Sequence, residues 1–341
     1  MNSLMLEESR SAPACVARQL TQDTARYTAL GQHLRSAPPD GGTLTVARGS
    51  SDHAASYLAY LLMARYGRLV TSLPMSLVTL YGAPLRHRHT LVVGISQSGR
   101  SPDLVEPFKA FRQGGGTTVA LVNAADSPLA EAAEWALPLH AGPELSVAAT
   151  KSFICALSAA ARLAAHWHED QNLLDTLHAL PPVLEQAAAL DWSAGIEALA
   201  GAERMMVIGR GTGLAVAQEA ALKLKETCAI QAEVFSSAEV QHGPMALVDA
   251  GYPMLVFAPP GPAQAGLLEL ARQMRARGAQ VLLAAPPDVA ERQLTLATSG
   301  LHELDPITAI QSFYGLAEAV SRARGRNPDR PPHLRKVTST L

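Results

Sequence analysis

The feature that most constrains the fold of this sequence is an internal repeat with an offset of about 162 residues. Four pairs of segments match in the same order along the chain: Leu44–Ser50 with Met206–Thr212, Leu91–Ile95 with Met254–Ala258, Val119–Val122 with Val281–Ala284, and Ser152–Phe153 with Ser312–Phe313. Gly49 and Gly211, in the first pair, lie 162 positions apart, and the last pair is offset by 160. One shared glycine would mean nothing, but four ordered matches at nearly one offset predict a tandem duplication.

Within each half, short apolar runs alternate with segments of helical period. Leu91–Ile95 is an uninterrupted apolar run, whereas Ala54–Tyr66 and Leu267–Arg277 have the spacing of amphipathic helices. Short, wholly apolar strands separated by helices are typical of a parallel sheet that is covered on both faces. Together with the right-handed rule for crossover connections, this pattern predicts an α/β fold in which each half is a three-layer αβα sandwich.

The repeat and the composition divide the chain into five expected regions. These are an N-terminal helix (residues 1–35), a first repeat (36–165), a helical connector (166–200), a second repeat (201–324) and a C-terminal tail (325–341). The tail has no periodicity and contains the run Asn327-Pro328-Asp329-Arg330-Pro331-Pro332, so its composition alone is that of a disordered terminus.

Composition and charge exclude several classes of protein. Of the 341 residues, 48% are hydrophobic and 17% are charged, which excludes intrinsic disorder. Lys and Arg (28) nearly balance Asp and Glu (30), so we expect no surface for nucleic acid. No apolar run is long enough for a membrane span, and Glu7 and Glu8 stand where a signal peptide needs basic residues. Cys15, Cys155 and Cys228 are far apart and odd in number, which indicates neither a disulfide framework nor a zinc site and predicts a cytoplasmic protein.

A loop rich in hydroxyl groups follows the apolar run that ends at Ile95. It reads Ser96-Gln97-Ser98-Gly99-Arg100-Ser101, and Pro102 suits the first turn of a following helix. Ligands of open α/β sheets bind beyond the carboxyl ends of the strands, where helix N-termini present free N–H groups. The loop therefore predicts a phosphate site, although an ordinary capped turn uses the same residue types. The equivalent loop of the second half, Pro259-Pro260-Gly261-Pro262, has lost the hydroxyls, which favours a site in the first copy only.

Two more hydroxyl-bearing turns could face the same ligand. Gly49-Ser50-Ser51-Asp52-His53 follows the first strand, and Val147-Ala148-Ala149-Thr150-Lys151 opens a later helix. Together with the loop after Ile95, these turns favour an anionic small molecule as the ligand.

A helix of the second half concentrates charged residues on one face. Glu219, Lys223 and Glu226 stand at i, i+4 and i+7. The pattern fits a catalytic site, and it fits equally a solvated face with an ion pair worth about 0.3–0.5 kcal/mol. Farther along, His242 precedes Gly243-Pro244, and a histidine held at such a turn suits proton transfer, although a lone histidine is more often structural. No second His or Cys stands at ligand spacing, so no metal site is predicted.

Six motifs in this order cover essentially the whole chain. They are Gly49-Ser50-Ser51-x-His53-Ala54, Ser96-Gln97-Ser98-Gly99, the run Glu144 to Lys151, Glu219-Ala-Ala-Leu-Lys223-Leu-Lys-Glu226, Glu239-Val-Gln-His242-Gly-Pro, and Leu334-Arg-Lys336-Val-Thr338. With these motifs the chain resembles the sugar isomerase (SIS) family, in particular the isomerase half of glucosamine-6-phosphate synthase and the SIS-type glucosamine-6-phosphate deaminases. The resemblance implies two tandem flavodoxin-like SIS domains and a homodimer whose sites lie at the subunit interface.

The resemblance also implies a role for each residue of the site. A sugar 6-phosphate would be held by Ser96, Gln97, Ser98 and Ser101, and the sugar would be contacted by Ser51 and the backbone of Val147. Glu226 would move a proton between C1 and C2, and His242 of the neighbouring subunit would assist ring opening. Glu219 and Lys223 would complete the polar site, and Lys336 would close over the sugar carbonyl or imine, which makes the tail a lid. No nicotinamide, flavin or metal cofactor is implied.

The expected reaction depends on what precedes the repeat. Glutamine-dependent synthesis needs a glutaminase domain with an N-terminal cysteine, whereas this chain begins Met1-Asn2 and the repeat starts almost at once. We therefore expect an amino-sugar-phosphate deaminase/isomerase that converts glucosamine 6-phosphate and water to fructose 6-phosphate and ammonia. The alternatives are a fructosamine-6-phosphate deglycase, a galactosamine-6-phosphate deaminase and a non-catalytic sugar-phosphate sensor. The presence of Glu226, His242 and Lys336 disfavours the sensor.

Overall fold

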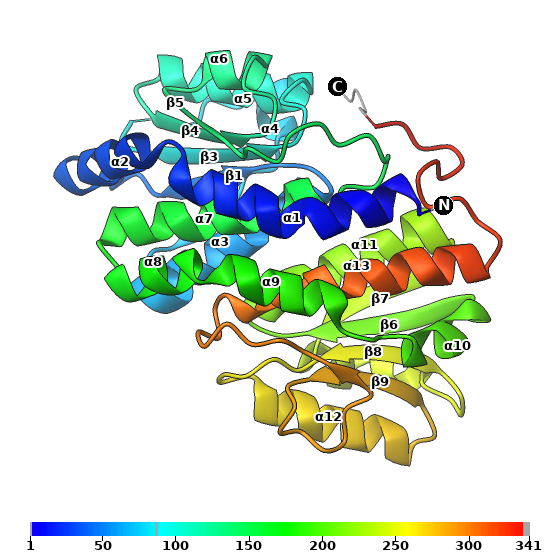
Figure 1. Cartoon of the computed structure of the whole chain (residues 1–341). Helices are drawn as coiled ribbons and strands as arrows, with labels where there is room; N and C mark the ends of the chain where they lie inside the picture. Colours follow the sequence, from blue (N-terminus) through cyan, green and yellow to red (C-terminus); the bar gives the residue numbers. More distant parts are fainter. Residues whose placement is uncertain (1, 86–87, 337–341) are drawn as a thin grey trace. The chain divides into compact units, whose positions relative to one another are not determined.

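The computed structural model of the chain describes residues 2–85 and 88–336, and it separates into two compact units (Figure 1). The first-repeat unit consists of Ala14–Glu144, Lys151–His178 and Arg335–Leu341, and the second-repeat unit consists of Met1–Pro13, Leu145–Thr150 and Ala179–Leu334. Each unit is built around one five-stranded sheet.

The sheet of the first-repeat unit is entirely parallel. Its strands are β1 (Thr43–Val46), β2 (Val70–Ser72), β3 (Leu91–Ser96), β4 (Thr117–Val122) and β5 (Trp135–Pro138), in the order β2-β1-β3-β4-β5. Helices α3 (Ser50–Tyr66) and α7 (Lys151–His168) cover one face, and α5 (Pro102–Gln113) and α6 (Pro128–Ala132) cover the other (Figure 1). The remaining helices of this unit are α2 (Thr24–Ser36), α4 (Ser76–Thr79), α8 (Gln171–His178) and the second half of α1 (Leu4–Thr21).

The sheet of the second-repeat unit is also entirely parallel. Its strands are β6 (Arg204–Gly209), β7 (Gln231–Ser236), β8 (Pro253–Phe257), β9 (Gln280–Ala285) and β10 (Leu294–Thr295), in the order β10-β9-β8-β6-β7. Helices α11 (Thr212–Cys228) and α13 (Asp305–Ala323) lie on one face, and α12 (Gln264–Ala276) lies on the other (Figure 1). Helices α9 (Leu180–Ala189) and α10 (Ala194–Ala200) pack on α13, and two short 3₁₀ helices, η1 (Glu239–His242) and η2 (Pro244–Leu247), follow β7.

The two sheets have the same topology, which confirms the predicted duplication and the predicted α/β class. Numbered within each repeat, both sheets have the strand order 2-1-3-4-5 of flavodoxin-like folds. The turns after the first strands also match: Gly49 has φ 56° and ψ −132°, and Gly211 has φ 62° and ψ −138°. These backbone angles favour glycine at both positions. The fourth matched pair is less regular, because Ser152 is the second residue of α7 whereas Ser312 lies inside α13.

The strands are apolar because both faces of each sheet are covered. All six residues of β3 are buried, and β4, β6 and β8 each have only their first residue outside the buried class. In the first-repeat unit, Val92 shares a core cluster with Phe108 of α5. In the second-repeat unit, Met254 shares a cluster with Leu270 of α12. The apolar runs that reveal the repeat in the sequence are therefore the central strands.

Residues 4–36 form two helices, α1 and α2, rather than the single N-terminal helix that the sequence predicts. Asp23, at the break, has a left-handed φ of 54°. Arg162 of α7 binds this break: its guanidinium donates to the carbonyls of Gln19 (2.7 Å) and Gln22 (2.8 Å) and to the hydroxyl of Thr24 (2.8 Å). The last carbonyls of a helix have no partner within it, so a buried cation that binds them ends α1 at this point.

The predicted connector over 166–200 is helical, and its parts belong to both units. It contains the end of α7 and the helices α8, α9 and α10. Residues up to His178 belong to the first-repeat unit, and those from Ala179 belong to the second-repeat unit.

The described part of the C-terminal tail is held in place, which corrects the expectation of disorder drawn from its composition. The carboxylate of Asp329 accepts the backbone N–H groups of Leu4 (3.0 Å) and Met5 (2.8 Å) at the start of α1. A carboxylate at a helix N-terminus pairs unsatisfied N–H groups and opposes the positive end of the helix dipole. The carbonyl of Asp329 also accepts the N–H of Val147 at 3.1 Å.

Across the two described stretches, the helices fall short of the length and apolar character that crossing a lipid bilayer requires.

The contacts of Arg162 predict a loss of stability on its replacement. Arg162 is 1% exposed, so Arg162→Leu leaves two carbonyls and a hydroxyl without their donor. We expect the free energy of unfolding to fall by about 3 kcal/mol in urea titrations. The matched control is Arg26→Leu, because Arg26 is exposed and donates to a single carbonyl, that of Ala136, and we expect a change below about 1 kcal/mol. Equal losses in the two variants would contradict this account of the break.

Candidate active site

The predicted phosphate loop joins β3 to α5 in the first-repeat unit. Ser96 is the last residue of β3, and its buried hydroxyl accepts the N–H of Gly99 at 2.9 Å. Gly99 has φ +62°, and a Cβ at this position would lie 2.1 Å from the hydroxyl of Ser127, so only glycine fits. The turn leaves Gln97, Ser98 and Ser101 partly exposed immediately before α5 begins at Pro102.

A second hydroxyl-bearing turn lies at the same edge of this sheet. Ser51 is in the first turn of α3, which follows β1, and β1 pairs in parallel with β3. Arg48, after β1, donates to the buried carboxylate of Asp103 in the first turn of α5 at 3.0 Å. This ion pair links the segments that follow the two strands, so Ser51 and the Ser96–Ser101 loop are neighbours at the carboxyl ends of β1 and β3.

This edge of the sheet has the chemistry of an anion site. It combines hydroxyl groups, the amide of Gln97 and the N-termini of two helices, which present N–H groups and the positive ends of their dipoles. Burial raises the pKa of Asp52, next to Ser51, against the opposing effect of His53 and Arg48. A raised pKa reduces the cost of placing an anion beside that carboxyl group at mildly acidic pH.

The equivalent edge of the second-repeat unit carries different residues. Gly261, which corresponds to Gly99, has φ +121°, and a Cβ there would lie 2.9 Å from Cβ of His302. The imidazole of His302 is in turn 3.2 Å from the carboxylate of Glu303. Prolines and the exposed His302 therefore stand at this edge in place of the hydroxyl groups of the first repeat, as the loss of hydroxyls in the sequence predicts.

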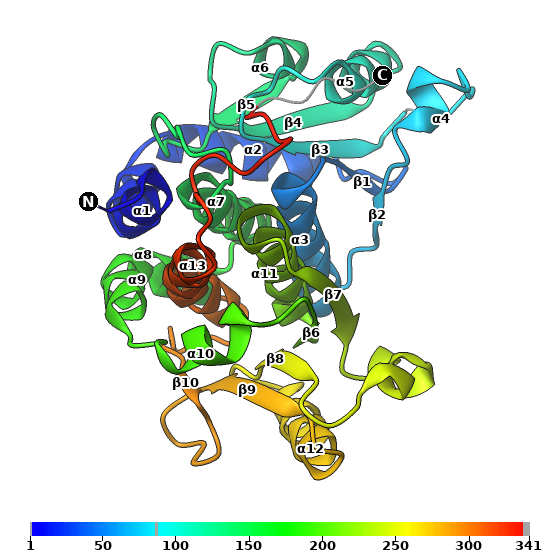
Figure 2. The same cartoon turned by 90° about the vertical axis from the view of Figure 1, so that its right-hand side faces the viewer.

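The three charged residues predicted on one helix face do lie together on α11, which packs against β6, β7 and α13 of its unit (Figure 2). The ammonium of Lys223 is 3.5 Å from Glu219 Oε1 and forms a shorter ion pair with Glu226 Oε2. The side chains of Glu219 and Lys223 are 0% and 1% exposed, whereas Glu226 is 23% exposed. The alternative interpretation of a solvated helix face is therefore wrong for two of the three residues.

The three residues of this cluster differ in burial and therefore in their ability to exchange a proton with a bound molecule. A buried charge is tolerated only with a partner, and Lys223 stands between two carboxylates. Glu219 also accepts a hydrogen bond from the hydroxyl of Tyr314 on α13 at 3.3 Å. Glu226 alone combines contact with the buried ammonium and access to solvent, so it is the carboxylate of this cluster that can exchange a proton with a bound molecule.

Lys336, predicted to close over the substrate, lies in the first-repeat unit and pairs there with Glu144. Its ammonium is 3.0 Å from Glu144 Oε2, and the Glu144 side chain is 0% exposed. Glu144 also accepts the backbone N–H (3.1 Å) and the hydroxyl (2.6 Å) of Ser152 at the start of α7. The remaining residues of that motif, Val337 and Thr338, lie outside the described residues.

His242 and Val147, also predicted in the site, lie in the second-repeat unit. Among the described residues, neither is hydrogen-bonded to the charged cluster on α11. His242 ends η1 and is exposed, and among residues 2–85 and 88–336 its ring has no hydrogen-bond partner. Val147, whose backbone is predicted to contact the sugar, donates its backbone N–H to the carbonyl of Asp329 at 3.1 Å.

Three residues without a predicted role contact the predicted site residues or one another: Glu144, Ser152 and Tyr314. Glu144 stands in a quoted motif, and a carboxylate eight residues before a serine at a helix start is a weak signal that could have found the pair. Tyr314 carries no such signal, because its partner is 95 positions away. In the described stretches, no three His, Cys, Asp or Glu side chains gather as metal ligands.

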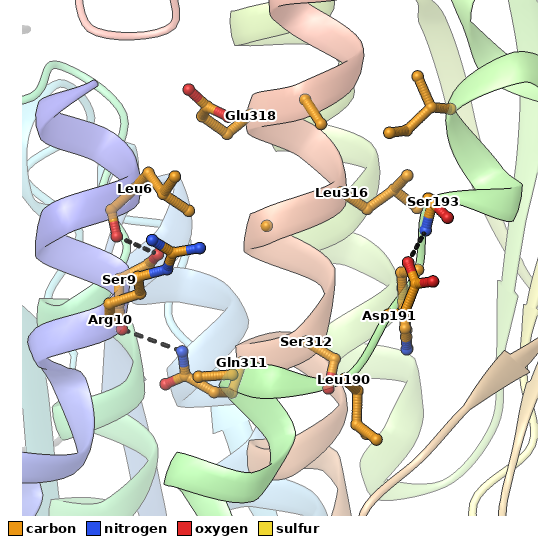
Figure 3. A pocket seen from close by; sticks show the side chains of 15 residues that line it. Leu6, Ser9, Arg10, Leu190, Asp191, Ser193, Gln311, Ser312, Leu316 and Glu318 are labelled. Carbon is orange, nitrogen blue, oxygen red and sulfur yellow. Dashed lines mark hydrogen bonds between the residues drawn. The ribbon is translucent and has the colours of Figure 1, made fainter. Parts of the chain in front are cut away.

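A cavity of about 260 Å³ in the second-repeat unit is separate from these residues (Figure 3). It is lined by α1, by the segment from Ala188 to Ile196 and by α13, with Arg10 reaching toward α13. None of the predicted site residues lines it.

Comparison with known proteins decides the family. The model of the SIS domain matches residues 43–165 and 198–285, that is, one segment in each repeat. The chain belongs to the SIS family. The two matched segments coincide with the two parallel sheets, which agrees with the duplication inferred from the sequence.

Members of the SIS family with assigned names are similar along most of the chain. The glutamine–fructose-6-phosphate aminotransferase [isomerizing] of Zymomonas mobilis is 34% identical over 310 residues, which are 85% of this chain and 51% of that protein. The chain thus spans about half the length of the curated relatives it matches. The crystal structure of a phosphosugar isomerase candidate from Silicibacter pomeroyi DSS-3 has 41% identity and a TM-score of 0.90, covering 96% of this chain and all of that one. Glucosamine-6-phosphate deaminase from Thermotoga maritima, at 20% identity and a TM-score of 0.77 over 99% of this chain and 100% of that one, shares the fold.

The buried ion pair of Lys223 and Glu219 on α11 predicts that removal of one charge destabilises the fold more than removal of both. Lys223→Met leaves Glu219 buried without its cation, and we expect the free energy of unfolding to fall by about 3–5 kcal/mol. The double variant Lys223→Met/Glu219→Gln removes both charges, so we expect it to recover most of that loss. Urea titrations of the two variants measure the difference. A single variant as stable as the unaltered chain would show that the pair carries no buried charge.

Proposed function

We propose that this SIS-family chain is an amino-sugar-phosphate deaminase/isomerase that converts glucosamine 6-phosphate and water to fructose 6-phosphate and ammonia. The observation that carries the proposal is the state of α11, where a partly exposed carboxylate, Glu226, is held by a buried ammonium, Lys223. Moving a proton between adjacent carbons of a sugar needs one positioned base with access to the substrate and a fixed charge beside it.

We expect the protein to bind its substrate through the phosphate group. Ser96, Gln97, Ser98 and Ser101 offer hydroxyl and amide groups at the N-terminus of α5, and Ser51 adds a hydroxyl at the start of α3. Backbone N–H groups and hydroxyls at helix N-termini bind phosphate without a metal ion. The similar proteins include glutamine–fructose-6-phosphate aminotransferases and a phosphosugar isomerase candidate, which supports a phosphosugar as the ligand.

The proposed chemistry proceeds through an open-chain sugar. His242 assists ring opening, and the Glu226 carboxylate then takes the proton from C2 and returns it to C1, which converts the aldehyde and the C2 amine to a C2 imine. Water adds to C2, and ammonia leaves. Lys223 orients Glu226, and Glu219 holds Lys223 in place. Lys336 stabilises the charge that develops on the substrate oxygen, and the backbone of Val147 contacts the sugar.

The nitrogen is proposed to leave as ammonia. A homodimer with shared sites stays a prediction from the resemblance.

A product assay tests the proposed function. The purified chain is incubated with glucosamine 6-phosphate, and ammonia and fructose 6-phosphate are measured together. Galactosamine 6-phosphate and fructosamine 6-phosphate, tested in parallel, decide between the deaminase and the two enzymatic alternatives. Micromolar binding without turnover of any of these compounds would overturn the enzyme and favour the sugar-phosphate sensor.

Replacement of the proposed base predicts a selective loss of turnover. Glu226→Gln keeps the size of the side chain but removes the base, so we expect kcat to fall by about 10²–10⁴-fold with little change in phosphosugar binding. The matched control is Glu233→Gln, because Glu233 is an exposed glutamate on β7 of the same unit. Steady-state kinetics of both variants provide the measurement, and equal kcat values for Glu226→Gln and the unaltered chain would refute the assignment of the base.

A further inference from the structure

The fold brings together two of the three cysteines, which are far apart in the sequence. Cys15 lies on α1 and Cys155 on α7, both in the first-repeat unit. The third, Cys228, ends α11 in the second-repeat unit and contacts Thr227 and the carbonyl of Ala317. All three are buried free thiols.

Backbone and side-chain contacts fix the position of the pair. Gln19 follows Cys15 by one helical turn, so both point to the same side of α1. The Gln19 side chain donates to the carbonyls of Cys155 and Leu139, each at 2.9 Å. The sulfur of Cys15 lies 3.4 Å from the carbonyl oxygen of Ala141. Cys15 is thereby held against the start of α7, beside Cys155.

The charges around the pair favour a thiolate on Cys15. The hydrogen bond from Cys155 and the nearby guanidinium of Arg18 lower the pKa of Cys15 to about 6, although burial opposes them. Lys151 of α7 acts in the same direction. The pKa of Cys155 is raised well above its usual range, chiefly by the same hydrogen bond, and Glu144 contributes. Of the two thiols, Cys15 is therefore the one that ionises first.

Cys228 provides a contrast within the same chain. Burial raises its pKa, and the hydrogen bond to Thr227 only partly offsets that effect. A buried thiol of this kind stays protonated and unreactive at neutral pH.

We propose that Cys15 and Cys155 form an oxidative modification site, in which a small hydroperoxide oxidises Cys15 and Cys155 then closes a disulfide. The Cys15 sulfur attacks the O–O bond, keeps one oxygen as a sulfenic acid, and releases the other as water or an alcohol. The Cys155 sulfur attacks the Cys15 sulfur, hydroxide leaves, and it takes up the Cys155 proton to form a second molecule of water. Two thiols lose two electrons, and the peroxide gains them.

The burial of the site selects the oxidant and sets the consequence of the reaction. Cys15 is 4% exposed and Cys155 is 0% exposed, so a small peroxide reaches the site more readily than a bulky disulfide reagent. The new bond links α1 to the first turns of α7. The same turns contain Ser152, which binds Glu144, the partner of Lys336.

The test maps disulfides in the full chain after oxidation. The reduced protein is treated with one equivalent of hydrogen peroxide at pH 7, unfolded in an alkylating reagent, digested without reductant and analysed by mass spectrometry. We expect a linked pair of peptides containing Cys15 and Cys155, reversed by dithiothreitol, and oxidation of Cys15 at least ten times faster than that of Cys228. Alkylated Cys15 and Cys155 in the oxidised sample, or equal oxidation of all three cysteines, would overturn the proposal.

Two further experiments distinguish a reactive cysteine pair from cysteines that are only buried. Cys155→Ser removes the second thiol, so we expect Cys15 to accumulate as a sulfenic acid that dimedone traps, whereas Cys228→Ser leaves the link unchanged. In the unaltered chain, we expect the rate of Cys15 oxidation to rise less than about two-fold between pH 7 and pH 8, because Cys155 and Arg18 lower the pKa of Cys15 to about 6, whereas an ordinary thiol gains nearly ten-fold. A ten-fold rise would contradict the proposed site even if the variant failed to fold.

Discussion

Parallel pairing of the strands decides where polar residues can act in this chain. Every strand pair in both sheets is parallel, so each strand ends at the same edge of its sheet and is followed by the N-terminus of a helix or by a turn. In the first repeat that edge displays Ser51 and the loop from Ser96 to Ser101. In the second repeat the equivalent edge carries prolines and His302 in place of hydroxyl groups. The duplication therefore produced two equivalent edges, and we propose that only the first binds an anion.

The second constraint is the burial of charged side chains, because the same ion pairs stabilise the fold and hold the proposed reactive groups in place. Lys223 is buried between two carboxylates, and only Glu226 reaches solvent. Glu144 is buried in the same manner and binds both Ser152 and Lys336. Isolated buried charges destabilise a fold, so each is present with its partners fixed. Side chains fixed in this way keep their geometry when a ligand binds, which is what proton transfer requires.

The sequence predicted what is local and missed what depends on distant partners. The apolar runs of β3 and β8 identify the duplication because a strand buried on both faces consists of consecutive apolar residues. The shared face of Glu219, Lys223 and Glu226 follows from helical spacing. The sequence could not tell a buried face from a solvated one. Composition alone could not predict that Asp329 of the tail binds the start of α1, more than 300 residues away, or that Cys15 and Cys155, on separate helices, lie close together. The roles of Ser98, Glu226, His242 and Lys336 remain predictions.

The most direct measurement of the central claim, that the first repeat alone binds the phosphate group, is calorimetric titration of fructose 6-phosphate and fructose into loop variants. We predict that Ser98→Ala weakens the binding of fructose 6-phosphate by about ten-fold, the loss expected for one hydrogen bond to a charged group. Pro260→Ala, in the equivalent loop of the second repeat, is predicted to leave the affinity unchanged, and fructose is predicted to bind weakly to every variant. Equal affinities of Ser98→Ala and the unaltered chain for fructose 6-phosphate, or a loss with Pro260→Ala instead, would contradict the account.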